Sequence, residues 1–275
     1  MKLGVFNELE VLRFTSVGAY LGDSSGEEVL LPNKYLNPDM KEGEMVNVFL
    51  YKDSEDRPVA TTETPYINLD HFALLKVKDT GPFGAFLDWG LEKDLLVPFR
   101  EQNVKLEVGG SYLVTLRYDN STDRLYGSSK LNKYLEPCMD PTYLNKQVHL
   151  LVGDSTELGV TVIVDDRYRG LIFRNDVNRP LRKGELIEGF VYNIRQDGKL
   201  DVRLVKSEVQ RYDESAATIL EMLQTEKKIM VSDKTDPDAI RERFHMSKKM
   251  FKQAIGKLYK DRLIHINDDS IELVS

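Results

Sequence analysis

Cysteine is almost absent from this 275-residue chain, in which Cys138 stands alone. A single cysteine cannot form an internal disulfide or a Cys-x-x-Cys motif. Apolar runs are short as well, such as Leu150–Val152, so we expect no segment that spans a bilayer. The first ten residues carry two glutamates and no apolar stretch, and we therefore expect no signal peptide. Together these absences predict a cytoplasmic protein that does not enter a membrane.

The signatures of common enzymes are missing too. The sequence has no Walker loop and no G-x-S-x-G motif. Its four histidines lie far apart, at positions 71, 149, 245 and 265, and none has the spacing of a metal-ligand pair. Asp165-Asp166 could in principle hold Mg²⁺, but an acidic pair of this kind is more typical of a turn. We therefore expect no enzymatic activity, no bound metal and no cofactor.

The charge of the chain argues against unselective binding of polyanions. The formal net charge is -7, and it is unevenly distributed. Residues 1–66 carry 6 basic and 12 acidic side chains, net -6. Residues 67–140 carry 9 basic and 11 acidic side chains, and residues 141–210 carry 11 basic and 10 acidic ones. Residues 211–275 carry 12 basic and 12 acidic side chains. Contacts with nucleic acid should therefore be local, and the first segment is the least suited to hold phosphate.

A repeat organises the first three quarters of the chain. VGAYLGD at 17–23 resembles FGAFLDW at 83–89, and VLLP at 29–32 resembles LLVP at 95–98, each 66 residues later. A fainter third copy lies 75 residues after the second, since Gly84, Pro98 and Gly109 correspond to Gly159, Phe173 and Gly184. A constant offset at several landmarks indicates three copies of one unit of roughly 65–75 residues.

Each copy has the pattern of five short strands. In the second copy we expect them at residues 72–78, 84–89, 94–97, 111–118 and 125–128, with Gly, Pro, Asn and Asp between them. Five short strands in one unit are typical of a closed OB-type barrel, which has no exposed sheet edge. We therefore assign barrels to residues 1–66, 67–140 and 141–210.

The sequence changes to a helical period near residue 212. An apolar stripe at positions 216, 219, 220 and 223 predicts one helix, and Asp236-Pro237 and Ser247 predict the N-terminal caps of two more. In the last helix Phe251, Ile255 and Leu258 form the expected buried face. Two strands, at 263–266 and 271–274, follow. The chain is thus predicted to be multidomain, with three tandem small β-barrels followed by an α+β winged helix-turn-helix in residues 211–275.

The stretch FGAFLD at 83–88, followed by LLVP, resembles the S1 family of RNA-binding OB folds. In that family two aromatic residues and a histidine form the RNA face. The resemblance places Phe83 and Phe86 at the aromatic positions of the second copy. Pro98 stands where the family usually has the histidine.

The other two copies keep less of this motif. The first copy has Tyr20 at the second aromatic position, and the third has Leu158 and Thr161 at the aromatic positions and Phe173 at the histidine position. As a whole, with three S1-like units and a winged helix, the chain is similar to the conserved virulence factor B family of bacterial RNA-binding proteins. The resemblance covers nearly all residues, and it implies RNA binding and post-transcriptional gene regulation, including regulation of virulence.

The residues themselves are consistent with a stacking surface in the second copy. An exposed aromatic ring can stack on an unpaired base for ~1–3 kcal/mol without reading sequence. Phe86 shares a strand face with Asp88, and because a charged Asp is seldom buried we expect Phe86 to be exposed. Trp89 shares the other face with Ala85 and Leu87, so we expect it in the core. The alternative is that Phe83 and Phe86 cover a neighbouring domain.

Candidate phosphate contacts are basic side chains near the aromatic positions. In the second copy they are Lys76, Lys78, Arg100 and Arg117. In the third copy arginines alternate with aromatic residues, a pattern suited to stacking and charge together, in Arg167, Tyr168, Arg169, Phe173 and Arg174. In the winged helix the candidates lie away from the apolar stripe and are Lys248, Lys249, Lys252 and Lys257. The alternative for both regions is a set of solvated charges.

These observations predict a non-catalytic protein that binds single-stranded RNA through the second and third copies, helped by the winged-helix lysines. The acidic first copy would serve architecture or contact a protein. Two alternatives stay open. One is a protein-interaction scaffold, with the aromatic residues buried between barrels and the winged helix docked on a partner. The other is a regulator that binds duplex DNA through the winged helix, against which the acidic Asp268 and Asp269 of the wing argue.

Overall fold

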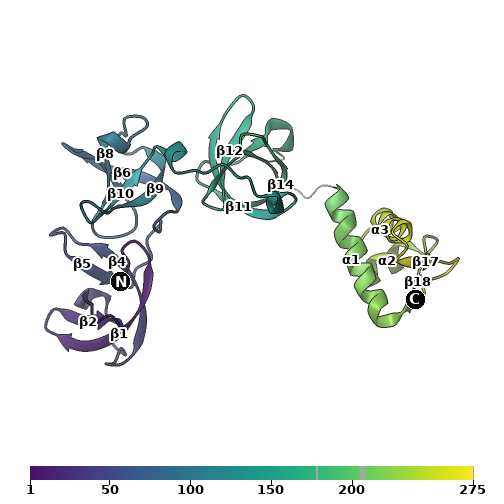
Figure 1. Ribbon diagram of the computed structural model, residues 1–275, viewed down its shortest axis with the longest axis horizontal. Helices are drawn as coiled ribbons and strands as arrows, with labels where there is room; N and C mark the ends of the chain where they lie inside the picture. Colours follow the sequence, from purple (N-terminus) through teal and green to yellow (C-terminus); the bar gives the residue numbers. More distant parts are fainter. Residues whose placement is uncertain (178, 205–207, 275) are drawn as a thin grey trace. The chain divides into compact units, whose positions relative to one another are not determined.

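The computed structural model describes residues 1–177, 179–204 and 208–274, and residues 208–214 are described in their backbone alone. The chain divides into two compact units, Met1–Val202 and Arg203–Ser275 (Figure 1). The first unit holds three five-stranded sheets, one for each copy of the repeat. The second unit is mainly helical.

The strands of the first unit follow the repeat. The first copy forms β1 (Phe6–Thr15), β2 (Gly18–Gly22), β3 (Glu28–Pro32), β4 (Met45–Lys52) and β5 (Pro58–Thr61). The second forms β6 (Phe72–Gly81), β7 (Gly84–Asp88), β8 (Leu95–Pro98), β9 (Ser111–Asp119) and β10 (Arg124–Ser128). The third forms β11 (Gln147–Ser155), β12 (Gly159–Val164), β13 (Tyr168–Phe173), β14 (Leu186–Ile194) and β15 (Leu200–Arg203). The five strands expected in the second copy are confirmed, each to within a few residues.

Short 3₁₀ helices join some of these strands. Three of them directly follow the third strand of a copy, at Asn33–Tyr35, Phe99–Glu101 and Arg174–Asp176. Two more, Leu131–Lys133 and Pro141–Tyr143, lie between the second and third copies.

The repeat is visible in backbone detail. The first strand of each copy has an irregularity in its pairing, at Val11/Arg13, Val77/Asp79 and Val152/Ser155. The second strand of each copy begins with glycine, at Gly18, Gly84 and Gly159, which all have φ between 152° and 158°. A Cβ added at Gly84 would lie 2.2 Å from the carbonyl oxygen of Val97 on β8. Glycine is therefore required here because the two strands approach so closely.

Closure differs between the copies. The first and third sheets are closed barrels, in which β3 pairs in parallel with β5 and β13 with β15. In the second copy the described residues form an open order, β10-β9-β6-β7-β8, without a ladder between β8 and β10. The expectation of a closed sheet is therefore wrong for this copy. Side chains fill the seam instead, since a Cβ on Gly127 of β10 would lie 2.7 Å from Val97 Cγ2.

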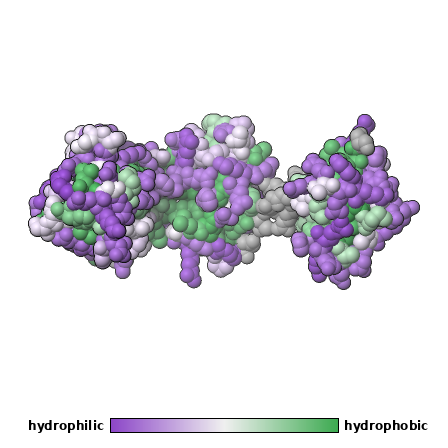
Figure 2. Space-filling view, turned by 90° about the horizontal axis from the view of Figure 1, so that it is seen from below, coloured by the Kyte–Doolittle hydropathy of each residue, from purple (hydrophilic) through white to green (hydrophobic). Residues whose placement is uncertain are grey.

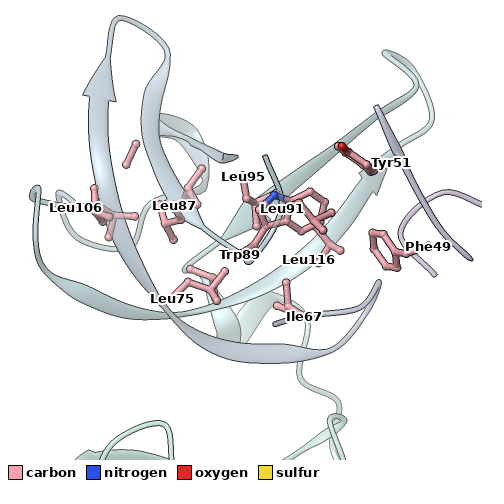
Figure 3. Close-up of a cluster of buried hydrophobic side chains, with 14 of the residues drawn as sticks. Phe49, Tyr51, Ile67, Leu75, Leu87, Trp89, Leu91, Leu95, Leu106 and Leu116 are labelled. Carbon is pink, nitrogen blue, oxygen red and sulfur yellow. The ribbon is translucent and has the colours of Figure 1, made fainter. Parts of the chain in front are cut away.

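The hydrophobic core of the second, partly open barrel extends to residues of the first barrel, which also has a core of its own. Trp89, 3% exposed, lies edge-on to Phe49 and Tyr51 of β4, with ring centroids 5.9 and 6.2 Å apart (Figure 3). Its indole Nε1–H donates a hydrogen bond to the carbonyl oxygen of Lys93 at 2.5 Å. The prediction that Trp89 is a core residue is confirmed, and this core spans two copies rather than one.

The second and third barrels also pack together. Phe72 and Leu113 share a buried cluster with Leu151 and Ile163 of the third barrel. The main-chain N–H of Phe72 donates to a carboxylate oxygen of Asp166 at 3.0 Å. Asp166 and its neighbour Asp165 have φ of 51° and 48° in the turn between β12 and β13, so the prediction of a turn at this acidic pair is confirmed.

The second unit has the predicted winged-helix elements. They are α1 (Glu208–Glu226), β16 (Lys228–Ile229), α2 (Pro237–Phe244), α3 (Lys248–Lys260), β17 (Ile264–Ile266) and β18 (Ile271–Leu273). The side chains of Asp236 and Ser247 accept main-chain hydrogen bonds at the starts of α2 and α3, so both predicted caps are confirmed. The short strand β16, which pairs with β18, was not predicted. Among the described residues no helix is long and apolar enough to cross a membrane.

Candidate nucleic-acid interface

An exposed aromatic pair lies at one edge of the second barrel. Phe83 immediately precedes β7 and is 72% exposed, and Phe99 immediately follows β8 and is 53% exposed. The antiparallel pairing of β7 with β8 places Gly84 opposite Pro98, so the start of one strand meets the end of the other. We call Phe83, Pro98 and Phe99 the aromatic edge. Phe99 was not predicted, although it directly follows the residue at the histidine position of the motif.

Phe86 contributes less to this surface than expected. It lies on β7 opposite Asp79 of β6 and is only partly exposed. Its ring covers Gly81, where an added Cβ would lie 3.1 Å from Phe86 Cε2. Phe83, rather than Phe86, is therefore the more accessible of the two predicted aromatic residues.

The cations predicted in the second copy differ in how they are held. Lys78 forms ion pairs with Asp94 at 2.9 Å and Asp88 at 3.5 Å. The hydrogen bond to Asp94 is the main cause of the raised pKa of Lys78. Arg117 is held by Asp70 at 2.8 Å and lies over the ring of Tyr134. These two side chains are committed to the fold, which reduces their capacity to bind phosphate.

Two other predicted cations are more accessible. Lys76 is exposed on β6, opposite Asp88 of β7. Arg100 follows Phe99 directly and is largely exposed, with a long contact of 3.5 Å to Asp119. Of the four cations predicted in the second copy, Arg100 is therefore the one that directly adjoins the aromatic edge in the sequence.

The first copy keeps its aromatic position but covers it. The guanidinium of Arg13 lies 4.3 Å from the centre of the Tyr20 ring. Arg13 is held there by Glu28, with an N···O distance of 2.7 Å. One face of Tyr20 is therefore occupied by a side chain of the same barrel, which disfavours base stacking on it.

The aromatic residues of the third copy are also engaged. Tyr168 is 5% exposed and packs edge-on against Tyr143, with ring centroids 5.0 Å apart. The expectation that Tyr168 stacks on RNA is therefore wrong, because its ring belongs to the core. Phe173 is partly exposed, and the guanidinium of Arg195 lies 5.4 Å from its ring centre.

The three predicted arginines of the third copy point to different partners. Arg167 Nε donates to Glu136 at 2.8 Å, and Arg169 Nη2 donates to the carbonyl oxygen of Asn132 at 2.9 Å. Arg174 begins the 3₁₀ helix after β13 and is exposed. The structure therefore does not gather the predicted Arg-aromatic segment into one surface.

The predicted lysines of the second unit all lie on α3. Lys249, Lys252 and Lys257 are exposed and Lys248 is partly buried. Lys252 also forms an ion pair with Asp233 at 3.4 Å. In the wing, Asp268 pairs with Lys234, which offsets part of the negative charge there. Within the described residues no three His, Cys, Asp or Glu side chains are grouped as a metal site would need.

Two domain families match this chain. An S1 domain matches residues 3–63, and a CvfB-like winged helix domain matches residues 217–273. The S1 match falls on the first copy, although the aromatic motif is best preserved in the second. S1 folds and winged helices are both domain types that bind nucleic acids, so these matches support nucleic-acid binding by this chain.

The similarity to curated proteins extends over almost the whole chain. The chain is 27% identical to Conserved virulence factor B of Staphylococcus haemolyticus and 28% identical to that of Staphylococcus epidermidis, over 98% of this chain and 94% of each relative. A crystal structure titled as a multidomain protein with nucleic acid binding domains, from Streptococcus pneumoniae, aligns over 99% of this chain and 98% of its own length. Its identity is 22% and its TM-score 0.42. The curated relatives and the two domain families confirm the predicted resemblance to conserved virulence factor B.

Proposed function

We propose that this chain, which is similar to conserved virulence factor B proteins from end to end, is a non-catalytic, cytoplasmic protein that binds single-stranded RNA and regulates gene expression after transcription. The observation that carries the proposal is the aromatic edge of the second barrel. Two phenylalanine rings are exposed there, next to Arg100. Unpaired bases stack on such rings, whereas the bases of a duplex are already stacked on each other.

The scaffold alternative explains the buried aromatic residues of the first unit better than it explains the aromatic edge. Phe49, Tyr51 and Trp89 are buried between barrels, as a scaffold would use them. Phe83 and Phe99 are exposed in the first unit, where burial would have lowered the free energy of large apolar side chains. Ligand binding by exposed rings is therefore the better explanation for the aromatic edge.

The test is the binding of a fluorescein-labelled oligouridylate, followed by fluorescence anisotropy at two salt concentrations. We expect the wild type to bind and to weaken with salt. Phe83→Ala/Phe99→Ala should lose about 2–6 kcal/mol of binding free energy, at ~1–3 kcal/mol for each base that stacks. The matched control is Phe14→Ala/Val17→Ala, which removes two exposed apolar side chains from the first copy.

The outcomes separate the two classes of function. Equal binding by both double variants would show that the aromatic edge is not the RNA surface. No binding by the wild type would favour the scaffold. Duplex DNA that binds more tightly than the single strand, and that is released when residues 211–275 are removed, would favour the DNA-binding alternative.

A further inference from the structure

A groove of about 1090 Å³ lies between the second and third barrels, within the first compact unit. One wall is formed by β12, β13 and the turn before β12. The other wall is formed by β9 and the segment that joins the two barrels. In Figure 2, hydrophobic side chains are exposed among hydrophilic ones on the visible face of the molecule. We call this space the inter-barrel groove.

The inter-barrel groove is lined by both apolar and basic side chains. Leu131, Leu158 and Leu171 are among its apolar lining residues. Its basic lining residues are Lys130, Lys133, Arg169, Lys183, Arg195 and Lys199, and its acidic ones are Asp154 and Glu157. Its volume of about 1090 Å³ slightly exceeds the roughly 300–1,000 Å³ typical of ligand sites.

The basic residues are not equally available to a ligand. Several are held by carboxylates, such as Lys183 by Asp154 at 2.6 Å and Lys133 by Glu101 at 3.1 Å. Lys130 is exposed, and in the part of the chain that the structure describes no carboxylate pairs with it. Arg169 donates one guanidinium N–H to the carbonyl oxygen of Asn132. Among the described residues no carboxylate forms an ion pair with it. Lys130, on the joining segment, and Arg169, on the third barrel, therefore offer positive charge from both walls.

We propose that the inter-barrel groove is a second binding site for single-stranded RNA and continues the path that begins at the aromatic edge. The inference rests on the function proposed above. Bases would lie against the aliphatic walls, and phosphates would face Lys130 and Arg169. Apolar and basic lining residues together suit a ligand that alternates flat apolar groups with negative charges, as a nucleic-acid strand does.

The aromatic edge and the inter-barrel groove lie close together, because one short segment of the second barrel contributes residues to both. Phe99 and Glu101 belong to the same 3₁₀ helix, and Glu101 holds Lys133 at the groove. Asn103, four residues after Phe99, lines the groove. Four residues span at most about 14 Å, so the aromatic edge and the groove are close enough for one strand to occupy both.

Two exposed leucines of the third copy provide a matched pair of variants. Leu158 lines the groove and is 66% exposed, whereas Leu186 is 77% exposed at the start of β14 and is not among the lining residues. Leu158→Asp and Leu186→Asp change the charge equally and spare the core. The probes are labelled oligouridylates of about twelve and about four nucleotides, which bracket the lower part of the ~4–16 nucleotides that OB folds bind.

We expect Leu158→Asp to weaken binding of the longer probe about tenfold or more, because a carboxylate in the groove repels phosphate. Leu186→Asp should bind like the wild type, and the shorter probe should not distinguish the two variants. Lys130→Ala/Arg169→Ala should lower the slope of log affinity against log salt by about 1.4, at ~0.7 per phosphate contact of a single strand. Lys2→Ala/Lys41→Ala, which removes two exposed lysines of the first copy, should leave that slope unchanged.

The failures of the two proposals look different. If the wild type binds both probes and Leu158→Asp matches Leu186→Asp on the longer one, the groove does not hold RNA while the aromatic edge still can. If Leu158→Asp weakens both probes equally, the groove is not a continuation of the aromatic edge. If the wild type binds neither probe, RNA binding fails as a whole and the groove site fails with it.

Discussion

The main-chain N–H of Phe99 donates a hydrogen bond to the main-chain carbonyl oxygen of Phe83, with an N···O distance of 3.2 Å. This bond extends the β7–β8 ladder by one step beyond Gly84 and Pro98. It fixes the backbone that carries both rings, and it does not involve the rings themselves. Alanine at either position should therefore remove an aromatic face while the backbone beneath it stays in place.

The single variants of the aromatic edge should affect binding more than stability. Phe83→Ala and Phe99→Ala should each weaken oligouridylate binding by ~1–3 kcal/mol. The free energy of unfolding should change by only about 0.5 kcal/mol, because both side chains are largely exposed. Phe86→Ala should instead affect stability more than binding. We expect it to lower the free energy of unfolding by roughly 2 kcal/mol, because the Phe86 ring covers Gly81. Anisotropy titrations and urea unfolding of the same preparations measure both quantities. A larger loss of binding in Phe86→Ala than in Phe83→Ala would contradict the assignment.

The repeat made most of this fold predictable from the sequence. A constant offset implies a constant backbone role, and Gly18, Gly84 and Gly159 do share one conformation. Caps and apolar periodicity likewise identified the helices of the second unit. The sequence did not predict that the second sheet is open, because the gap between β8 and β10 depends on how Val97 packs against Gly127.

The candidate site was predictable only in part. Phe83 stands in a recognisable motif, but Phe99 enters the site through the pairing of β7 with β8, which no local pattern specifies. Tyr168 illustrates the opposite error, because an Arg-aromatic alternation does not reveal whether a ring faces solvent or the core. The inter-barrel groove depends on how two barrels pack, and its cations are scattered along the sequence.

Two glycines, one crowded and one with open space around it, test whether the close approach of β7 and β8 requires glycine. Gly84→Ala should destabilise the protein by several kcal/mol, since the new Cβ would lie 2.2 Å from the Val97 carbonyl oxygen at a φ that alanine rarely adopts. Gly256→Ala should stabilise the second unit by about 1 kcal/mol, because it lies in α3 and the added Cβ would have no heavy atom within 4 Å apart from its chain neighbours and the backbone of its own helix. Thermal unfolding followed by circular dichroism measures both. A neutral Gly84→Ala would show that β7 and β8 can move apart without cost.

Glu101 should make stability depend on pH. Its carboxylate accepts hydrogen bonds from Ser128 at 2.8 Å, Tyr134 at 3.0 Å and Lys133 at 3.1 Å. Burial is the largest single influence and raises the pKa of Glu101, but these hydrogen bonds together outweigh it and leave the pKa below its ordinary value of 4.5. The stabilisation is therefore complete above pH 4.5 and is lost as the pH falls through the lower, folded-state pKa.

Glu101→Gln measures this contribution. An amide cannot accept all three hydrogen bonds as a carboxylate does, so the variant should be about 1–3 kcal/mol less stable at pH 7. The difference from the wild type should shrink as the pH falls below 4.5, since the wild-type carboxyl is then neutralised too. Urea unfolding across pH 3–7 records the profile, and the exposed Glu107→Gln is the control. A difference that does not change with pH would assign the loss to packing rather than to charge.

The last prediction concerns the core that joins the first two barrels. Trp89→Ala should cost about 3–5 kcal/mol, because it empties the space between β4 and the second barrel. Trp89→Phe keeps an aromatic ring there and loses mainly the hydrogen bond to Lys93, so it should cost roughly 1–2 kcal/mol. Oligouridylate binding by folded Trp89→Phe should equal that of the wild type, because Trp89 follows the last residue of β7 whereas Phe83 and Phe99 lie at the opposite end of the β7–β8 pair. Loss of binding without loss of folding in Trp89→Phe would show instead that the packing of the first barrel shapes the RNA surface.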